Sequence, residues 1–330
     1  MKKKILLITT GGTIASEASA QGLSPTINDE NLLSHLGNIT INYEVETTEL
    51  FHLDSSNVQP EEWAQIAQCI AESLHSYDGI VLTHGTDTMA YTSSVLSFML
   101  QNITIPVVLT GSQLPITHPL TDAFENLRCA FAMAASGTAG VFVAFDRRVM
   151  FGSRAVKVRT TAFDAFESVN SSYAAVTNAQ GLQLLYTPAA PQGEFKLYDK
   201  LCPDVFLMKL TPGLNPEIFD MLMQMNYKGI VIEAFGAGGL HFIRRDLISK
   251  LQKIVENGVT VVVCSQCLYE RSDFSIYEVG QKALATGVIQ AYDMTTEAAF
   301  TKLMWALGVT ESQPALRTMF ATSFAGEISL

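Results

Sequence analysis

Three short polar segments each follow an apolar run of the chain and carry hydroxyl groups beside glycine. They read TTGGTI at residues 9–14, HGTDT at residues 84–88 and TGSQ at residues 110–113. A threonine hydroxyl is a poor nucleophile unless a base lies near it, and glycine permits sharp turns that aim backbone N–H groups at a developing oxyanion. The three segments therefore indicate either acyl-transfer chemistry or three tight turns without a chemical role.

A lysine in a fourth segment offers a partner for this chemistry. Lys157 lies between Val156 and Val158. Such a lysine either extends into solvent from an edge strand or points inward, where an unpaired ammonium group is too costly to bury. In the second case Asp87 is the candidate partner, and the pair beside Thr86 would form a relay of threonine, lysine and aspartate.

These segments need a framework that brings them together. Short β-branched runs recur with little polar alternation, which is typical of parallel strands buried on both faces, and helical patterns fill the intervals. Because functional groups collect at the carboxyl ends of such strands, the pattern predicts an α/β fold with a doubly wound, mostly parallel sheet. The expected strands are residues 4–9, 79–83, 106–110, 140–145, 205–210, 229–233 and 259–264, and the expected helices are residues 60–76, 88–101, 122–136, 215–224 and 246–258.

The length of 330 residues, or 36.0 kDa, favours two domains. Between Tyr186 and Asp204, prolines and a glycine interrupt a polar stretch that supports neither a helix nor a central strand. We therefore expect a catalytic α/β domain over residues 1–186, a linker over 187–204 and a smaller α/β domain over 205–330.

Composition narrows the class of partner. Hydrophobic residues make up 48% and charged residues 16%, as in a globular chain with a large core, and the net charge is −11. That charge argues against nucleic acid or anionic membranes as partners and favours a small neutral or zwitterionic molecule. Five scattered cysteines suit a reducing compartment. The four apolar residues 5–8 are too few for a signal peptide, so the chain is expected in the cytoplasm.

Two other motifs resemble redox or nucleotide sites, with less support. Cys264 and Cys267 have Cys-x-x-Cys spacing, but one such pair cannot supply four zinc ligands, and the chain length does not suit a small redox domain. Residues 236–241, GAGGLH, begin like a dinucleotide fingerprint but end on His241. The six histidines show no metal-ligand spacing, so neither a metal nor a cofactor is expected.

The sequence TGGTIA at residues 10–15, followed by HGTDTMAYT at residues 84–92, closely resembles the two signatures of the L-asparaginases. The resemblance continues through DSSN at residues 54–57 and FDAFES at residues 163–168, and is greatest to the cytosolic type I bacterial branch. It implies a larger catalytic N-terminal domain and a smaller C-terminal domain. It also implies homodimers or homotetramers with sites near a subunit interface.

The same resemblance implies the role of individual residues. Thr13 would be the nucleophile that attacks the side-chain amide of L-asparagine, releasing ammonia and leaving a β-aspartyl enzyme for water to hydrolyse. Thr86, Asp87 and Lys157 would activate water or assist proton transfer. The substrate contacts would come from Thr86, Asp87, Ser55, Ser56 and Ser112, with Asp87 at the α-ammonium group and the serines Ser55 and Ser56 at the α-carboxylate.

One departure from the family concerns the loop after the first signature. Many relatives carry a tyrosine there, whereas residues 21–25 read QGLSP, with Leu23 near the comparable place. The role of that tyrosine would then fall to Tyr43, to Tyr91 or to a residue of a neighbouring subunit, unless the relay of Thr86 and Lys157 is sufficient without it. The composition of residues 14–26 is that of a mobile lid.

The missing tyrosine also motivates a rival hypothesis, a catalytically silent sensor of asparagine or aspartate on the same fold. A third alternative is the amidase of aspartyl-tRNA transamidation, which shares features of the family. The net charge of −11 and the lack of an obvious tRNA-binding module argue against the third.

Overall fold

The computed structural model describes residues 2–19, 22–25, 34–37, 39, 41–186, 188 and 193–329. The chain forms two compact units, Met1–Asp199 and Lys200–Leu330. The division falls inside the stretch that the sequence suggests as a linker. Within that stretch, β14 (Lys196–Leu197) pairs with β6 (Leu100–Gln101), so these two residues belong to the first unit.

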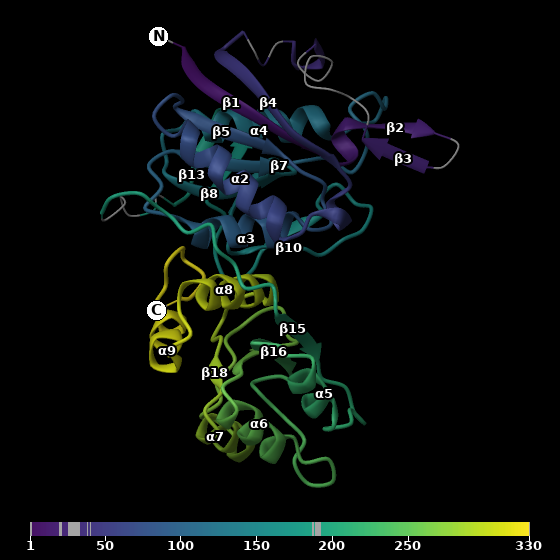
Figure 1. Cartoon of the computed structure of the whole chain (residues 1–330). Coiled ribbons are helices and arrows are strands. Elements are labelled where there is room, and N and C mark those ends of the chain that lie inside the picture. Colours follow the sequence, from purple (N-terminus) through teal and green to yellow (C-terminus); the bar gives the residue numbers. More distant parts are fainter. Residues whose placement is uncertain are drawn as a thin grey trace. The chain divides into compact units, whose positions relative to one another are not determined.

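The first unit is built on an eight-stranded, mostly parallel sheet in the order β13-β12-β9-β8-β7-β5-β1-β4 (Figure 1). The parallel strands are β4 (Tyr43–Leu53), β1 (Lys3–Gly11), β5 (Gly79–Thr83), β7 (Pro106–Thr110) and β8 (Gly140–Phe145). Antiparallel pairing extends the sheet through β9 (Arg148–Phe151), β12 (Ala175–Asn178) and β13 (Gly181–Leu184).

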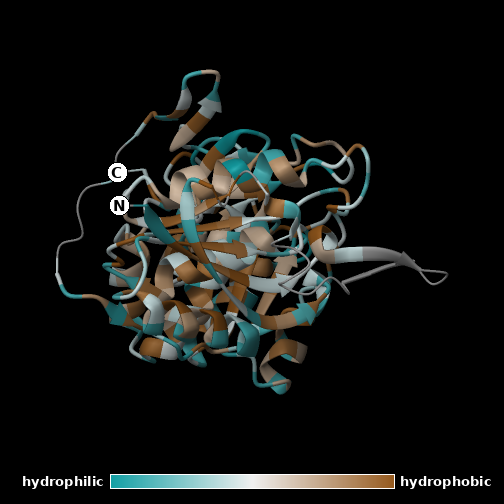
Figure 2. Ribbon diagram, turned by 90° about the horizontal axis from the view of Figure 1, so that it is seen from above, coloured by the Kyte–Doolittle hydropathy of each residue, from teal (hydrophilic) through white to brown (hydrophobic). Residues whose placement is uncertain are grey.

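Helices cover both faces of this sheet, which confirms the doubly wound α/β architecture. The helices are α2 (Pro60–Ser73), α3 (Met89–Met99) and α4 (Ala123–Ala134). α4 packs on the face that carries Leu7, Val81 and Val108. Successive side chains of a strand point to opposite faces, so the intervening residues face α2 and α3 (Figure 1). Figure 2 shows the hydrophobic strands enclosed between these layers.

Local sequence signals explain where two helices begin and end. α2 begins at Pro60, and the Gln59 backbone N–H donates to the Glu62 carboxylate at 2.8 Å in a capping box. α6 (Leu247–Glu256) ends before Asn257 and Gly258, and Gly258 has a φ of +88°. Both boundaries were expected from the sequence.

Several short elements of the first unit lie outside the large sheet. The 3₁₀ turns η1 (Thr13–Ala15) and η2 (Ser55–Asn57) follow β1 and β4. β10 (Ala155–Lys157) pairs with β11 (Phe166–Ser168), and β2 (Ser16–Ser19) pairs with β3 (Gly22–Pro25). The described part of the segment predicted as a lid, residues 14–26, therefore lies mostly in a β-hairpin, while its residues 20, 21 and 26 lie outside the described residues.

The second unit is a smaller parallel α/β domain, as expected. Its sheet has the order β15-β16-β17-β18, and its core joins the strands to α5, α6 and α7 on one face. α8 packs on the other face, where its Leu303 lies against Gly229. The strands are β15 (Val205–Lys209), β16 (Gly229–Ala234), β17 (Thr260–Ser265) and β18 (Ile289–Gln290). The helices besides α6 are α5 (Ile218–Gln224), α7 (Glu278–Ala285), α8 (Thr296–Val309) and α9 (Gln313–Ala321).

Candidate active site

The hydroxyl-bearing segments gather at one edge of the large sheet. Thr13, Ser55, Thr86 and Ser112 follow the carboxyl ends of β1, β4, β5 and β7, which are parallel neighbours. The chain passes from β1 to β4 on one side and then to β5 and β7 on the other, so the strand order reverses between β1 and β5. Parallel α/β sheets bind their ligands at such a reversal, and Thr13 and Thr86 flank it.

Two glycines let these segments approach one another closely. A methyl group on Gly12, whose φ is +79°, would lie 2.5 Å from the Gly85 nitrogen. A methyl group on Gly85 would lie 2.6 Å from the hydroxyl oxygen of Ser55. Any side chain would therefore force the turns apart. The Thr13 turn, the Thr86 segment and the Ser55 turn are thus packed tightly against one another at Gly12 and Gly85.

Hydrogen bonds fix the Thr13 turn itself. The Ser16 hydroxyl donates to the Gly12 carbonyl at 2.9 Å, and the Ile116 N–H donates to the Ile14 carbonyl at 3.2 Å. Ile14 is buried, whereas Thr13 is partly exposed. The fold therefore holds Thr13 on a rigid turn and leaves its side chain within reach of a small molecule.

Thr86, Asp87 and Lys157 come together as the relay hypothesis requires. The Lys157 ammonium nitrogen lies 2.8 Å from Thr86 Oγ1 and 2.6 Å from Asp87 Oδ1. The Lys157 side chain is 16% exposed and that of Asp87 is 66% exposed. The view of Lys157 as a solvated edge-strand lysine is therefore wrong, because β10 turns it toward the sheet edge. The pair is not fully buried either, because the Asp87 carboxylate reaches water.

Ser55 joins this group through its hydroxyl and its carbonyl. Its hydroxyl accepts a hydrogen bond from the Asp87 N–H at 3.3 Å, and its carbonyl accepts one from the Thr88 hydroxyl at 2.7 Å. The side chain is buried against Gly85. Ser55 therefore lies in the same cluster as Thr86 and Asp87.

The other two predicted serines direct their hydroxyls to partners in their own turns. Ser56 is exposed and donates to the Asp54 carboxylate at 2.5 Å, and the hydrogen bonds from Ser56 lower the pKa of Asp54. Ser112 is buried and donates to the Leu114 carbonyl at 2.5 Å. Each would have to give up that bond to donate to a substrate, so their predicted roles stay predictions.

Two neighbours of the site were missed as candidate residues in the sequence. One is Gln113, whose amide oxygen lies 3.5 Å from Thr86 Oγ1. The other is His84, which precedes Gly85 and is fully buried. Their presence in the TGSQ and HGTDT segments was the only signal, because nothing in the local pattern shows which way either side chain points.

His84 forms a hydrogen-bonded chain under the Thr86 segment. Its Nδ1 lies 2.7 Å from the Gly85 carbonyl, which only accepts, so Nδ1 carries the hydrogen. Its Nε2 then accepts from the Thr92 hydroxyl at 3.0 Å, and that hydroxyl accepts from Trp63 Nε1 at 2.9 Å. Burial lowers the pKa of His84 to about 4, against a smaller opposing effect of the Gly85 carbonyl. His84 is therefore a neutral support of the segment.

Tyr43 and Tyr91, the two candidates to replace the missing loop tyrosine, lie in different parts of the first unit. Tyr43 begins β4 opposite Lys3, at the amino ends of the strands, and stacks on Phe131 with ring centroids 5.8 Å apart. It is therefore at the wrong edge of the sheet. Tyr91 lies in the first turn of α3. Leu23 belongs to β3, but its side chain is not among the described ones.

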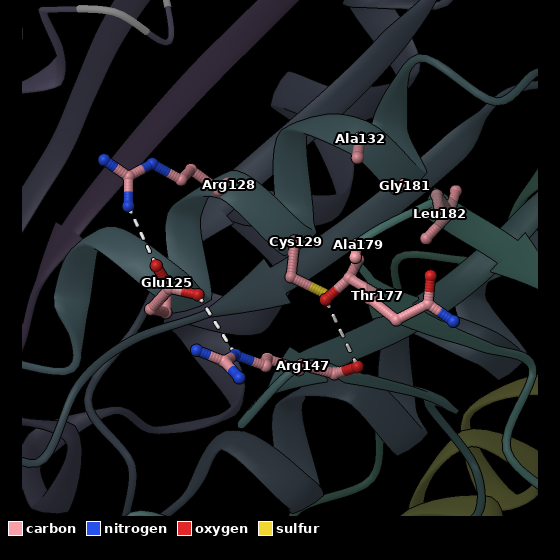
Figure 3. A pocket seen from close by; sticks show the side chains of 10 residues that line it. Glu125, Arg128, Cys129, Ala132, Arg147, Thr177, Ala179, Gly181 and Leu182 are labelled. Carbon is pink, nitrogen blue, oxygen red and sulfur yellow. Dashed lines mark hydrogen bonds and ion pairs between the residues drawn. The ribbon is translucent and has the colours of Figure 1, made fainter.

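A separate cavity of about 440 Å³ lies beside α4 and shares no residue with the site (Figure 3). Arg128 and Arg147 at its rim both pair with Glu125, at 2.9 and 3.1 Å. Burial raises the pKa of its cysteine, Cys129, to about 11, so this sulfur is a protonated thiol. The cavity lining therefore contains no activated nucleophile.

The structure gives no support to the Cys-x-x-Cys pair as a redox site or to residues 236–241 as a dinucleotide site. Burial raises the pKa of Cys264 to about 12, so this member of the Cys-x-x-Cys pair is a protonated thiol. The glycine-rich residues 236–239 do not lead directly into a helix, because α6 begins at Leu247. Among the described residues, no three His, Cys, Asp or Glu side chains form a possible metal site, and no helix is long and apolar enough to cross a membrane.

Comparison with known proteins places this site in a family. The family model for the N-terminal domain of asparaginases matches residues 4–190. The model for the glutaminase/asparaginase C-terminal domain matches residues 204–320. The chain belongs to the asparaginase family. The two segments that resemble the family signatures, residues 10–15 and 84–92, are the ones that meet at the reversal of the sheet.

Several asparaginase-family relatives match over the whole chain. The L-asparaginase of Thermococcus kodakarensis is 42% identical over 99% of both chains, and its solved structure has a TM-score of 0.93. The solved L-asparaginase I of Vibrio cholerae is 29% identical over 100% of both chains, with a TM-score of 0.89. One subunit of the glutamyl-tRNA(Gln) amidotransferase of Pyrococcus abyssi is 38% identical, and the match covers 99% of this chain and 77% of that protein.

Proposed function

We propose that this protein hydrolyses L-asparagine to L-aspartate and ammonia through a β-aspartyl intermediate on Thr13. The observation that carries the proposal is the position of Thr13 across the reversal of the sheet from Thr86, whose hydroxyl contacts Lys157 at 2.8 Å. The family relatives named L-asparaginase support the same substrate.

The reaction proceeds in two displacements. The Thr13 hydroxyl oxygen forms a bond to the amide carbon while its proton is taken up, and the C–N bond breaks with protonation of the leaving nitrogen. Water then attacks the resulting ester, and Thr13 recovers its proton. Turn N–H groups at the carboxyl ends of β1 and β5 are suited to stabilise the oxyanion.

The neighbouring groups divide the remaining tasks. Lys157 donates to Thr86 Oγ1 and favours its ionised form, which makes Thr86 the group to activate water or move the proton. Asp87, whose carboxylate reaches solvent, meets the α-ammonium group of the substrate. Ser55 and Ser56 hold the α-carboxylate, and Ser112 lies toward the amide.

Replacement of Thr13 tests the proposal directly. In Thr13→Ala, ammonia release from asparagine should fall by several powers of ten, while binding measured by calorimetry changes little because the ammonium and carboxylate contacts remain. Thr13→Ser is the matched control, since it keeps a hydroxyl and should keep part of the turnover. Near-full turnover in Thr13→Ala would move the nucleophile to another residue, first of all Thr86.

The silent-sensor alternative gives a different result with the unmodified protein. A sensor would be stabilised against heat by asparagine and release no ammonia from it. A subunit of a tRNA amidotransferase, which is what the Pyrococcus relative is named, would release little ammonia without its partner. Steady ammonia release from asparagine alone excludes both.

The assembly and the compartment follow the family resemblance. We propose a homodimer or homotetramer in the cytoplasm, and a homologous protein from Campylobacter jejuni, 26% identical, is described as a probable cytoplasmic L-asparaginase. Exposed apolar side chains in the segments after β16 and β17, among them Ile243, Tyr269 and Ile276, support a covered surface. Sedimentation at a mass of 36.0 kDa would contradict the proposed assembly.

A further inference from the structure

Gln113 connects the Thr86 hydroxyl to the segment that follows Lys157. Its amide nitrogen donates to the carbonyls of Thr160 and Ala162, each at 3.1 Å. Its amide oxygen lies 3.5 Å from Thr86 Oγ1. A carboxamide has two N–H bonds, and both are taken by carbonyls, so the oxygen is the atom that must face Thr86. The reversed amide would set its oxygen against two carbonyl oxygens.

The backbone of Gln113 is held as firmly as its side chain. Its N–H donates to both oxygens of the Asp122 carboxylate at 3.0 Å. Asp122 is buried and also accepts from Leu114 and from the Asn126 amide, and Asn126 in turn donates to the Gly111 carbonyl. The turn after β7 is therefore fixed to the start of α4, and Gln113 has little freedom to move.

This geometry determines the direction of the Thr86 hydroxyl proton. The oxygen of Thr86 already accepts a hydrogen bond from the Lys157 ammonium group at 2.8 Å. Gln113 Oε1 can only accept, so it favours the orientation in which the hydroxyl proton points away from Lys157. At 3.5 Å this bond is long for a hydroxyl donor, so the proton is directed without being held tightly.

We propose that Gln113 is a positioning residue for the Thr86–Lys157 pair. Its amide ties the segment after β10 to the turn after β7 and orients the Thr86 hydroxyl for proton transfer. This inference rests on the proposed function, because it assigns Gln113 a part in the chemistry that Thr86 and Lys157 perform.

Two substitutions separate positioning from packing. Gln113→Glu keeps the shape but loses both donors and sets carboxylate oxygens against the carbonyls of Thr160 and Ala162. We expect kcat to fall by about tenfold or more with little change in KM, because the substrate contacts remain while the Thr86 hydroxyl loses its orientation. Gln113→Met keeps the volume without a hydrogen-bonding group and should also lower kcat with little change in KM.

The matched control is Gln101→Met in the same unit. Gln101 donates its amide to the Phe98 carbonyl at 2.9 Å and has no contact with Thr86. This variant should keep the kcat and KM of the unmodified protein. If both Gln113 variants do the same while their melting curves show native folding, the positioning role is excluded.

A second measurement does not depend on turnover. Crystal structures of the variants report the distance between Lys157 Nζ and Thr86 Oγ1, which is 2.8 Å in the unmodified protein. In Gln113→Glu this distance should increase, because the segment after β10 loses its tie to the turn after β7, whereas in Gln101→Met it should stay. An unchanged distance overturns the inference about Gln113, while absence of ammonia release from the unmodified protein would overturn the proposed function instead.

Discussion

Lys157 and Asp87 show how differently two members of one ion pair can be exposed. Loss of a partner from a fully buried pair costs about 3–5 kcal/mol, but the Asp87 carboxylate is 66% exposed and water can solvate it. In Lys157→Met the side chain keeps its apolar stem. We therefore expect activity to be lost while the free energy of unfolding falls by about 1 kcal/mol or less.

Parallel measurements of ammonia release and urea unfolding check this expectation. Asp78→Asn is the control, because it breaks the exposed Lys3–Asp78 pair, at 2.8 Å, far along β1 from the site. It should change stability little and leave turnover intact. A loss of several kcal/mol in Lys157→Met would mean that Asp87 is desolvated in solution.

His84 makes stability depend on pH. Its pKa is about 4 in the folded protein against 6.5 for an ordinary histidine, so between these values the unfolded chain binds more protons. Stability from neutral His84 is complete above pH 6.5 and falls as the pH decreases, with a loss of about 3 kcal/mol by pH 4. Urea unfolding at pH 7 and pH 4 measures it.

The His84→Asn variant isolates this contribution from that of the carboxylates. Its amide can still donate to the Gly85 carbonyl but does not titrate in this range. The decrease in unfolding free energy from pH 7 to pH 4 should therefore be smaller than in the unmodified protein. An equal decrease in both proteins would mean that His84 is not buried in its neutral form.

At the residue level, the sequence predicted which residues lie together better than it predicted their orientation. Thr86, Asp87 and Lys157 were identified together, and they are in contact. The direction of Lys157 could not be read from Val156 and Val158, because it depends on the pairing of β10 with β11. The contacts of Gln113 were hidden for the same reason, since its partners lie far along the chain.

Among the elements, the turns after β1 and β5 approach each other so closely that they are sensitive to a single methyl group. In Gly12→Ala the new carbon would lie 2.5 Å from the Gly85 nitrogen on a backbone with φ +79°. Separation of the two turns by about 1 Å should lower kcat by about 100-fold, and strain should cost about 1–3 kcal/mol of stability. Steady-state kinetics and thermal unfolding measure the two effects.

Gly137→Ala provides the matched control for Gly12→Ala. Gly137 has a similar φ of +74°, but a methyl group there would meet nothing within 4 Å. It should therefore lose stability from the left-handed backbone alone and keep its turnover. Equal kinetic effects in the two variants would show that the close approach to Gly85 does not position the site.

The elements that the sequence missed lack the pattern by which the others were found. β4 alternates glutamate with apolar or hydroxyl residues at the sheet edge, so it has no continuous apolar run. α8 is buried over most of its length and has no polar face to mark a helical period. The central strands were predicted because strands buried on both faces consist almost entirely of apolar residues.

For the whole molecule, the sheet topology determines which distant segments meet. Thr13 and Thr86 follow two strands that are neighbours only because the chain passes β1 on its way from β4 to β5. The sequence predicted parallel strands but could not order them by composition alone. The family signatures supplied that order indirectly, since they associate the two segments in one site.

The same rigid arrangement leads us to expect selectivity between asparagine and glutamine. The Thr13 turn, the Ser55 turn and the segment of Asp87 are interlocked through Gly12 and Gly85, so the span from the α-carbon contacts to the nucleophile is fixed. The extra methylene of glutamine must then buckle or shift the amide carbon away from Thr13.

A rigid site and an adaptable site differ in the size of the preference for asparagine and in whether that preference appears in kcat or in KM. One methylene discriminates by about 10–200-fold in binding, whereas displacement of the reacting carbonyl by about 1 Å costs about 100-fold more in rate. We therefore expect asparagine to be preferred mainly in kcat, with KM values for the two amides closer together. Steady-state kinetics with both substrates measures this directly. Comparable kcat values would mean that the β2–β3 hairpin or the Ser55 turn adapts to either length, and the span between the anchors and Thr13 would not be fixed.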